Sequence, residues 1–207
     1  MRILLLWNTF LSLLATLSGL FLVGFMSVHF LGVSLINFGD DALNWYTAHL
    51  DKSNIFIVLA VLAVILVFLV HMINGFRVMW RYFRHLPEVH TYVGNMKYKD
   101  SFLWYIHFLT GILLAIFVTV HLTIACFAGS HTVTTVNIIR EQLADPRYLT
   151  VMGILLAVLI THGVCGIRNI IIKYNLFEKY RTIIFYGLAF LGLGLFALGL
   201  NNLYLLQ

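Results

Sequence analysis

The stretch Thr161-His162-Gly163-Val164-Cys165-Gly166-Ile167-Arg168 lies inside a long apolar run from Leu149 to Ile172. A glycine follows the histidine by four residues, which is one turn later on the same face of a helix, and an arginine follows two residues after that. The same His-x3-Gly-x-Arg pattern occurs earlier as His71-Met72-Ile73-Asn74-Gly75-Phe76-Arg77. Two copies, each near the basic end of its own apolar span, predict two helices that face one shared ligand.

The composition is that of a membrane protein. Of the 207 residues, 61% are hydrophobic and only 10% are charged, too few charges to cover a soluble domain. Five apolar runs reach the roughly 20 residues that a helix needs to cross the hydrocarbon core. We therefore predict an all-α integral membrane bundle of five transmembrane helices, forming a single membrane domain over residues 1–207. The expected spans are Phe10–Ile36, Asn54–Phe83, Ser101–Ala128, Arg147–Lys173 and Thr182–Leu206.

Two classes of cofactor site do not fit this sequence. Cys126 and Cys165 lie inside apolar runs without a CxxC spacing, so they cannot supply the four closely spaced ligands of an iron–sulfur or zinc site. No glycine-rich phosphate loop follows a strand, so we expect no nucleotide or flavin domain in this chain.

Basic residues are concentrated on one side of the expected membrane. Ten of the 13 Lys and Arg residues fall on that side, and only Lys52, Arg140 and Arg147 fall on the other. Because the basic side faces the cytoplasm, we predict a cytoplasmic N-terminus and a location in a bacterial cytoplasmic (inner) membrane. We call the basic side inner and the opposite side outer. The net charge of +5 is then a topology signal, and no nucleic-acid partner is expected.

The outer connections receive two different predictions. The polar segment Asn37–Ser53 is expected to be a loop, and a short helix is expected over Val136–Leu143.

Four histidines sort into two pairs by depth. His29 and His121 each lie seven residues before the outer end of their spans, whereas His71 and His162 lie eleven or twelve residues before the inner ends of theirs. The outer pair therefore comes from the first and third spans, and the inner pair from the second and fourth.

Glycines support this sorting. Ser18-Gly19 precedes His29 by ten residues, and Thr110-Gly111 precedes His121 by ten. Ten residues is roughly 15 Å of helix, so both glycines should lie at the level of the inner pair. There they would leave room for a bulky flat ligand.

Paired imidazoles at two depths favour two haem groups. A neutral imidazole in a bilayer core costs roughly 1–3 kcal/mol unless it is bonded, and a single one is most often satisfied by a hydroxyl on a neighbouring helix. Haem iron accepts two axial imidazoles, one from each of two helices. We expect the other ring nitrogen of each histidine to be tied to a carbonyl or hydroxyl on its own helix.

Haem propionates are anionic and should pair with cations near the aqueous faces. The candidates are Arg77, Arg168 and Lys173 at the inner side and Arg140 at the outer side. The three inner cations could instead extend to lipid headgroups, which is the interpretation we favour for Arg77 and leave open for Arg168.

The remaining histidines receive weaker roles. His85, His90 and His131 are expected to be solvated, and His107 to be an interfacial residue beside Trp104. His49 is kept as a site candidate because it lies among carboxylates near the outer pair.

These residues resemble the di-haem cytochrome b membrane-anchor subunit of succinate:quinone oxidoreductases and quinol:fumarate reductases. The resemblance covers Thr16 to Phe177. It is carried by Ser18-Gly-Leu-Phe-Leu, Phe25-Met-Ser-Val-His29, Asp100-Ser-Phe-Leu-Trp-Tyr-Ile, Thr110-Gly111, Val120-His121-Leu122 and His162-Gly163-Val164-Cys165-Gly166 with Lys173 and Phe177.

The resemblance implies a set of roles. His71 and His162 would bind the iron of the inner (proximal) haem b, and His29 and His121 that of the outer (distal) haem b. Haem contacts are expected from Thr16, Gly19, Gly75, Trp104, Gly111, Arg140, Gly166, Arg168 and Lys173. FAD and iron–sulfur clusters would reside in a separate flavoprotein subunit and a separate iron–sulfur subunit on the cytoplasmic face. Dimers of complexes occur in the family.

A menaquinone site is expected at the outer side, where menaquinol would be oxidised and electrons would pass inward. Two glutamates used by some family members are missing, since Ile160 occupies one position and the second has no clear counterpart. The nearby polar residues are the candidates: Asp40, Asp41, Asn44, His49 and Asp51.

Two other functions are compatible with membrane histidines. A cytochrome b of a formate dehydrogenase or hydrogenase also uses paired histidines, but one histidine on each of the first four spans fits it less well. A haem-free transporter could use the histidines as a proton or metal path, although no carboxylate lies between the two levels.

Overall fold

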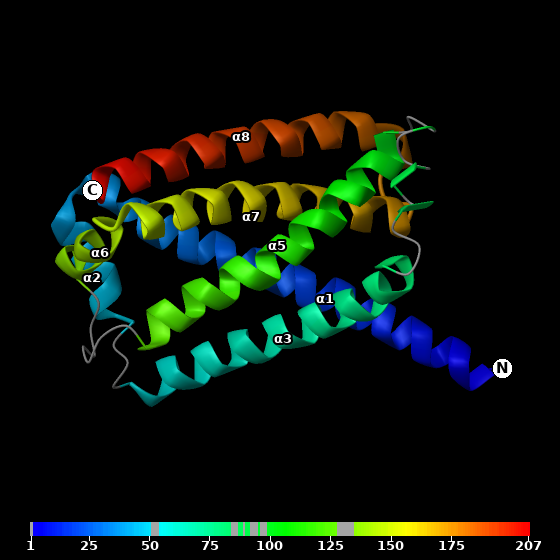
Figure 1. The fold of residues 1–207 in the computed structure, drawn as a ribbon, viewed down its shortest axis with the longest axis horizontal. Coiled ribbons are helices and arrows are strands. Elements are labelled where there is room, and N and C mark those ends of the chain that lie inside the picture. Colours follow the sequence, from blue (N-terminus) through cyan, green and yellow to red (C-terminus); the bar gives the residue numbers. More distant parts are fainter. Residues whose placement is uncertain are drawn as a thin grey trace.

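Five long helices form the body of the protein (Figure 1). The structure is a computed structural model, and it describes residues 2–50, 54–83, 87–88, 90–91, 95, 99–127 and 135–207. Each long helix is apolar enough to cross a membrane, which confirms the predicted all-helical class with five candidate spans. They are α1 (Arg2–Val33), α3 (Ile55–Phe83), α5 (Lys99–Phe127), α7 (Pro146–Lys173) and α8 (Arg181–Leu205).

The long helices pack mainly as two pairs with α8 added at one side. α1 packs along α3, α5 packs along α7, and α8 packs on α7. Contacts between the two pairs are sparse, and α5 crosses obliquely over its neighbours (Figure 1). The interior between the pairs is therefore lined by α1, α3, α5 and α7.

Local sequence signals set the ends of α7. Asp145 caps its first turn by accepting a hydrogen bond from the backbone N–H of Arg147 at 2.8 Å, and Pro146 occupies the first turn, where no N–H is needed. At the other end, Asn175 (φ 52°) and Phe177 (φ 49°) adopt left-handed backbone conformations. They turn the chain through the short 3₁₀ helix η2 (Glu178–Tyr180) into α8.

The segment expected to be a loop is largely helical, so that prediction was wrong. It contains the 3₁₀ helix η1 (Ser34–Phe38) and α2 (Asp40–Ala48), which meet at Gly39 (φ 105°). Asp40 and Asp41 in the first turn of α2 interact favourably with its dipole, and Leu43 is buried beneath it. The predicted short helix is confirmed as α6 (Val136–Leu143).

These short elements form an outer cap, which we define as η1, α2, α6 and the last turn of α8. Figure 1 shows α2, α6 and the C-terminus at one end of the bundle, opposite the N-terminus. The cap has its own apolar core, made of Ile36, Leu43, Val136, Leu143 and Leu206. Side-chain hydrogen bonds join η1 to α8, from Asn202 to Ser34 Oγ (2.8 Å) and from Asn37 to Asn202 Oδ1 (2.7 Å).

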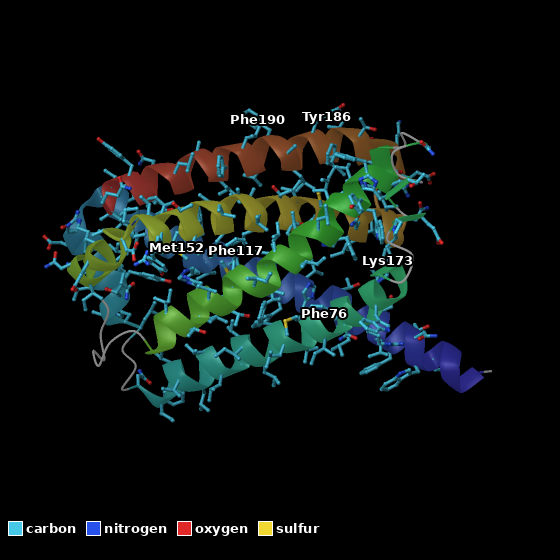
Figure 2. All side chains as sticks on the ribbon, in the orientation of Figure 1. Phe76, Phe117, Met152, Lys173, Tyr186 and Phe190 are labelled. Carbon is cyan, nitrogen blue, oxygen red and sulfur yellow. The ribbon has the colours of Figure 1, made fainter. Side chains whose placement is uncertain are left out.

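The long helices instead expose apolar side chains, as helices in lipid do. Phe190 is 80% exposed, and Figure 2 shows Tyr186 and Phe190 on the side of α8 that faces away from the bundle. The outer cap is thus built like a small water-soluble core, whereas the body is built for a bilayer.

Candidate functional site

The structure brings the inner histidines together across the interior. His71 comes from α3 and His162 from α7, and their ring centroids lie 6.4 Å apart with the planes at 90°. Because α3 and α7 belong to different helix pairs, these rings face each other where contacts between the pairs are sparse.

Both inner rings are held through Nδ1. Ser18 Oγ of α1 lies 3.1 Å from Nδ1 of His71, and Thr110 Oγ1 of α5 lies 3.2 Å from Nδ1 of His162. The backbone carbonyl of His107 is also 3.2 Å from Nδ1 of His162. The expected partners were thus of the right chemical kind, but they lie on the neighbouring helix and not on the histidine's own helix. Holding Nδ1 fixes the ring orientation and leaves Nε2 for a ligand.

Two glycines let the rings of His71 and His162 lie close to the backbones of α1 and α5. A Cβ atom added at Gly19 would lie 3.0 Å from Cε1 of His71, and one added at Gly111 would lie 3.2 Å from Cε1 of His162. The prediction that both glycines reach the inner level is confirmed. Their closest neighbours are the histidine rings, so each glycine makes room for an imidazole.

The outer histidines form a second pair of the same spacing. The ring centroids of His29 (α1) and His121 (α5) lie 6.4 Å apart with the planes at 63°. The ring of Phe25 stacks on His29 at 6.0 Å. Nδ1 of His121 is buried and has no hydrogen-bond partner among the described residues, which leaves it bonding capacity that they do not use.

A fifth histidine, His107, belongs to the inner site, although the sequence suggested an interfacial role. Its ring centroid lies 4.2 Å from that of His162, and its Nδ1 lies 2.9 Å from the side-chain nitrogen of Asn169. A Cβ at Gly166 would lie 3.3 Å from its Nε2. The signal was present in the sequence, because His107, Thr110 and Gly111 share one helix face at spacings of three and four.

At the inner end, polar groups join α1 to α7 below the inner pair. Nζ of Lys173 donates to Thr16 Oγ1 (2.9 Å) and to the carbonyl of Ser12 (3.1 Å). The hydroxyl of Tyr174 donates to the same Thr16 oxygen at 3.2 Å. The structure therefore brings together Thr16 and Lys173, and Figure 2 shows Lys173 near this end of the bundle.

Two further expected contacts, Trp104 and Gly75, lie near inner-site histidines along their own helices. Trp104 stacks on Phe108 at 5.9 Å, three residues before His107 on α5. A Cβ at Gly75 would meet no atom within 4 Å, one turn after His71.

The structure places two expected arginines elsewhere. Arg168 pairs with Asp100 and lies over the ring of Phe185 at 5.5 Å, so it points toward α5 and α8 and not to the inner histidines. Arg140 makes two hydrogen bonds to Asp40, at 2.5 and 3.0 Å, and a third to the carbonyl of Leu205. The bonds from Arg140 lower the pKa of the Asp40 carboxyl.

Two of the quinone-site candidates, Asp40 and Asn44, form bonds within the outer cap. Asp40 is paired with Arg140, and Asn44 Oδ1 accepts a hydrogen bond from the backbone N–H of Val136 at 2.9 Å. His49 is exposed, its ring packs against that of Trp45 at 4.4 Å with the planes tilted by 48°, and its Nδ1 lies 2.7 Å from the Trp45 carbonyl oxygen. Asp51 lies outside the described residues.

Tyr46 was not among the candidates, yet it closes the outer cap over α1. Its ring packs against Gly32, where an added Cβ would lie 2.1 Å from a ring carbon. Burial there raises the pKa of the Tyr46 phenol.

The two histidine pairs fit haem better than a bare metal ion. Two imidazoles on opposite sides of one metal, with metal–nitrogen bonds of about 2.0–2.1 Å, have ring centres about 6–6.5 Å apart. Both pairs have this spacing. Among the described residues, no group of three or more His, Cys, Asp or Glu side chains could hold a metal ion. Two ligands per site suit a metal whose other positions are filled by a porphyrin.

The fold and site define a multi-pass membrane protein with two levels of paired histidines. Residues 87–200, more than half of the 207, match the family described as succinate dehydrogenase/fumarate reductase transmembrane subunit. The chain belongs to this family, and it is therefore a membrane subunit of a succinate dehydrogenase/fumarate reductase complex. His121 and His162 lie in the matched part, while His29 and His71 precede it. A comparison with curated proteins finds no matching relative.

Proposed function

We propose that this chain is the two-haem cytochrome b subunit of a menaquinol:fumarate reductase or succinate:quinone reductase complex. It would carry electrons between menaquinone and a cytoplasmic iron–sulfur subunit. The observation that carries this proposal is the recurrence of one geometry at two depths: two imidazoles from different helix pairs, with centroids 6.4 Å apart.

The four histidines have one role each. His71 and His162 bind the inner haem b, and His29 and His121 bind the outer one. When bound, each haem supplies a one-electron redox centre. The chain orients the two inner ligands through the hydroxyls of Ser18 and Thr110, which hold Nδ1 of His71 and His162 and would leave Nε2 free for the iron.

Haem contacts follow from the same geometry. Lys173 and Thr16 lie between the inner pair and the inner membrane face, where anionic propionates would find a cation and a hydroxyl. Trp104, Gly75 and Gly166 lie on the helices that carry or flank the inner ligands. At the outer end, the guanidinium of Arg140 would have to bind both a propionate of the outer haem and the carboxylate of Asp40.

The partner subunits would dock at the inner end. We propose a flavoprotein carrying FAD and an iron–sulfur protein on the cytoplasmic face, and an orientation in a bacterial cytoplasmic membrane with the N-terminus inside. The excess of basic residues at that end supports this orientation.

Menaquinol would be oxidised beside the outer pair. Among the described candidates, His49 and Asp41 are exposed, whereas Asp40 and Asn44 bond to other parts of the cap, and we take the imidazole of His49 as the proton acceptor. Asp51 stays a candidate two residues further along the chain.

The test uses the complete complex with a water-soluble menaquinol analogue and fumarate. His49→Phe with Asp51→Leu should abolish quinol oxidation while the haem content stays normal. Glu141→Gln, an exposed outer carboxylate on α6, is the matched control and should keep full turnover. Full turnover in the His49/Asp51 variant would remove the quinol site from this segment, whereas a wild-type complex without haem would overturn the whole proposal.

A further inference from the structure

A second polar site lies at the inner end, between α5, α7 and α8. The cavity there has a volume of about 280 Å³. Its polar lining includes Asp100 from α5, Arg168 from α7, and Arg181 and Thr182 from α8. Leu103, Ile171 and Leu188 contribute apolar walls.

This cavity is separate from the histidine sites. On α7, Lys173 follows His162 by eleven residues, or about three turns, so both lie on the face toward α1 and α5. Arg168 leaves α7 in a different direction, toward Asp100 and Phe185. The same α7 therefore presents one face to the interior and another to this cavity.

The charge in the cavity is positive and sheltered. Two guanidinium groups line it against one carboxylate. The Arg168 side chain is 12% exposed while that of Asp100 is 73% exposed, so the carboxylate is mostly turned to the surroundings and the guanidinium is not. Nε of Arg181 is buried and has no hydrogen-bond partner in the part of the chain that the structure describes, although another nitrogen of the same group donates to Asn175.

These donors match a phosphate group. A guanidinium offers five N–H donors in a planar fork that fits phosphate oxygens. Thr182 adds a hydroxyl, and the first turn of α8, which begins at Arg181, adds the positive end of a helix dipole. A buried Arg nitrogen without a partner is costly unless an anion approaches it.

The position of the cavity indicates which phosphate it takes. It lies at the inner ends of three membrane helices, where lipid headgroups are found, and apolar side chains of α5, α7 and α8 form part of its wall. We propose that the cavity binds the phosphate of an anionic glycerophospholipid in the inner leaflet. This inference needs neither haem nor quinone, and it goes beyond the proposed electron-transfer role.

The test is native mass spectrometry of the purified full chain with defined additives. Dioleoyl phosphatidylglycerol is the probe, dioleoyl phosphatidylcholine the zwitterionic comparison, and inorganic phosphate the soluble source of the same group. Arg168→Gln and Arg181→Gln should each weaken phosphatidylglycerol binding by about tenfold or more, because each removes a charged phosphate partner. Lys179→Gln is the matched control, since Lys179 is an exposed cation of η2 outside the cavity lining.

Each outcome decides the proposal. The proposal is supported if the wild-type chain binds one phosphatidylglycerol and Lys179→Gln binds it equally well. The arginine variants must lose this binding, and millimolar phosphate must not displace the lipid. Equal binding in wild type and both arginine variants would overturn the site, and displacement by phosphate would overturn the lipid assignment. Arg181→Gln leaves the Arg168–Asp100 pair intact, so it decides the matter even if Arg168→Gln does not fold.

Discussion

At the scale of single residues, Gly19 and Gly111 position the inner histidines. Their added Cβ atoms would press on imidazole carbons at 3.0 and 3.2 Å, distances that real Cβ contacts rarely show. Neither neighbour is a freely rotating chain end, because hydroxyl groups hold both rings. Substitution there should therefore disturb the ligands and not only the packing.

We predict that Gly19→Ala perturbs the inner haem while Gly24→Ala on the same helix does not. A Cβ at Gly24 meets nothing within 4 Å, so that variant only gains helix propensity of about 1 kcal/mol. The crowding in Gly19→Ala should cost about 1–3 kcal/mol. Haem occupancy and thermal unfolding measure both effects; equal behaviour of the two variants would contradict the role of Gly19.

We also predict that His107 positions His162. His107→Phe keeps an aromatic ring against His162 but loses the contact with Asn169. The haem should remain bound, and the electron paramagnetic resonance g-values of the inner haem should change, because they depend on the relative orientation of the two axial rings. Asn169→Ala should produce a shift of the same kind, and His49→Phe at the outer end should produce none. Unchanged inner g-values in His107→Phe would reduce His107 to a packing residue.

At the scale of elements, the helices were more predictable than their connections. Long apolar runs reveal membrane helices directly, so the presence of five long apolar helices could be predicted. The segment carrying α2 is polar and short, and its helix depends on burying Leu43 against α6, ninety residues away. No local pattern indicates that contact.

The candidate site also has a part that could be predicted from the sequence and a part that could not. Pairing by depth follows from the rise of a helix, so His29 with His121 and His71 with His162 could be predicted. The ion-pair partners of Arg140 and Arg168 could not be predicted, because tertiary packing brings Asp40 and Asp100 to them. His107 was misjudged because an imidazole near a helix end also fits an interfacial role.

Close packing of α8 on α7 depends on two glycines. A Cβ at Gly199 would lie 2.6 Å from Leu156, and one at Gly192 would lie 3.0 Å from Val164, whereas one at Gly194 meets nothing within 4 Å. Small residues of this kind allow membrane helices to approach.

We predict that Gly199→Leu destabilises the chain by about 1–3 kcal/mol through overpacking. Gly194→Leu, on the same helix, should leave the unfolding temperature near that of the wild type. Thermal unfolding in detergent measures both. Equal destabilisation would mean that α8 responds to helix propensity and not to its contact with α7.

At the scale of the whole molecule, the two ends of the bundle differ in construction. The outer end is closed by a cap with its own apolar core and an Asp40–Arg140 ion pair. The inner end carries most of the basic residues. This asymmetry fits a subunit that meets quinone at one end and protein partners at the other.

We predict that a membrane-impermeant maleimide labels Glu141→Cys from outside intact cells and does not label Glu178→Cys. Glu141 lies in α6 of the outer cap, and Glu178 lies in η2 at the inner end. Both native cysteines are replaced in the background, and permeabilised cells show that each site can react. The reversed labelling pattern would invert the proposed orientation.

The most direct test of the account is the haem content of the purified chain, measured from reduced-minus-oxidised spectra, in the wild type and in four single His→Ala variants. The account predicts two b-type haems per chain. His71→Ala and His162→Ala should lose the same haem, and His29→Ala and His121→Ala should lose the other. A folded wild-type chain with fewer than two haems, or variants whose losses pair differently, would contradict the two-level arrangement of histidines.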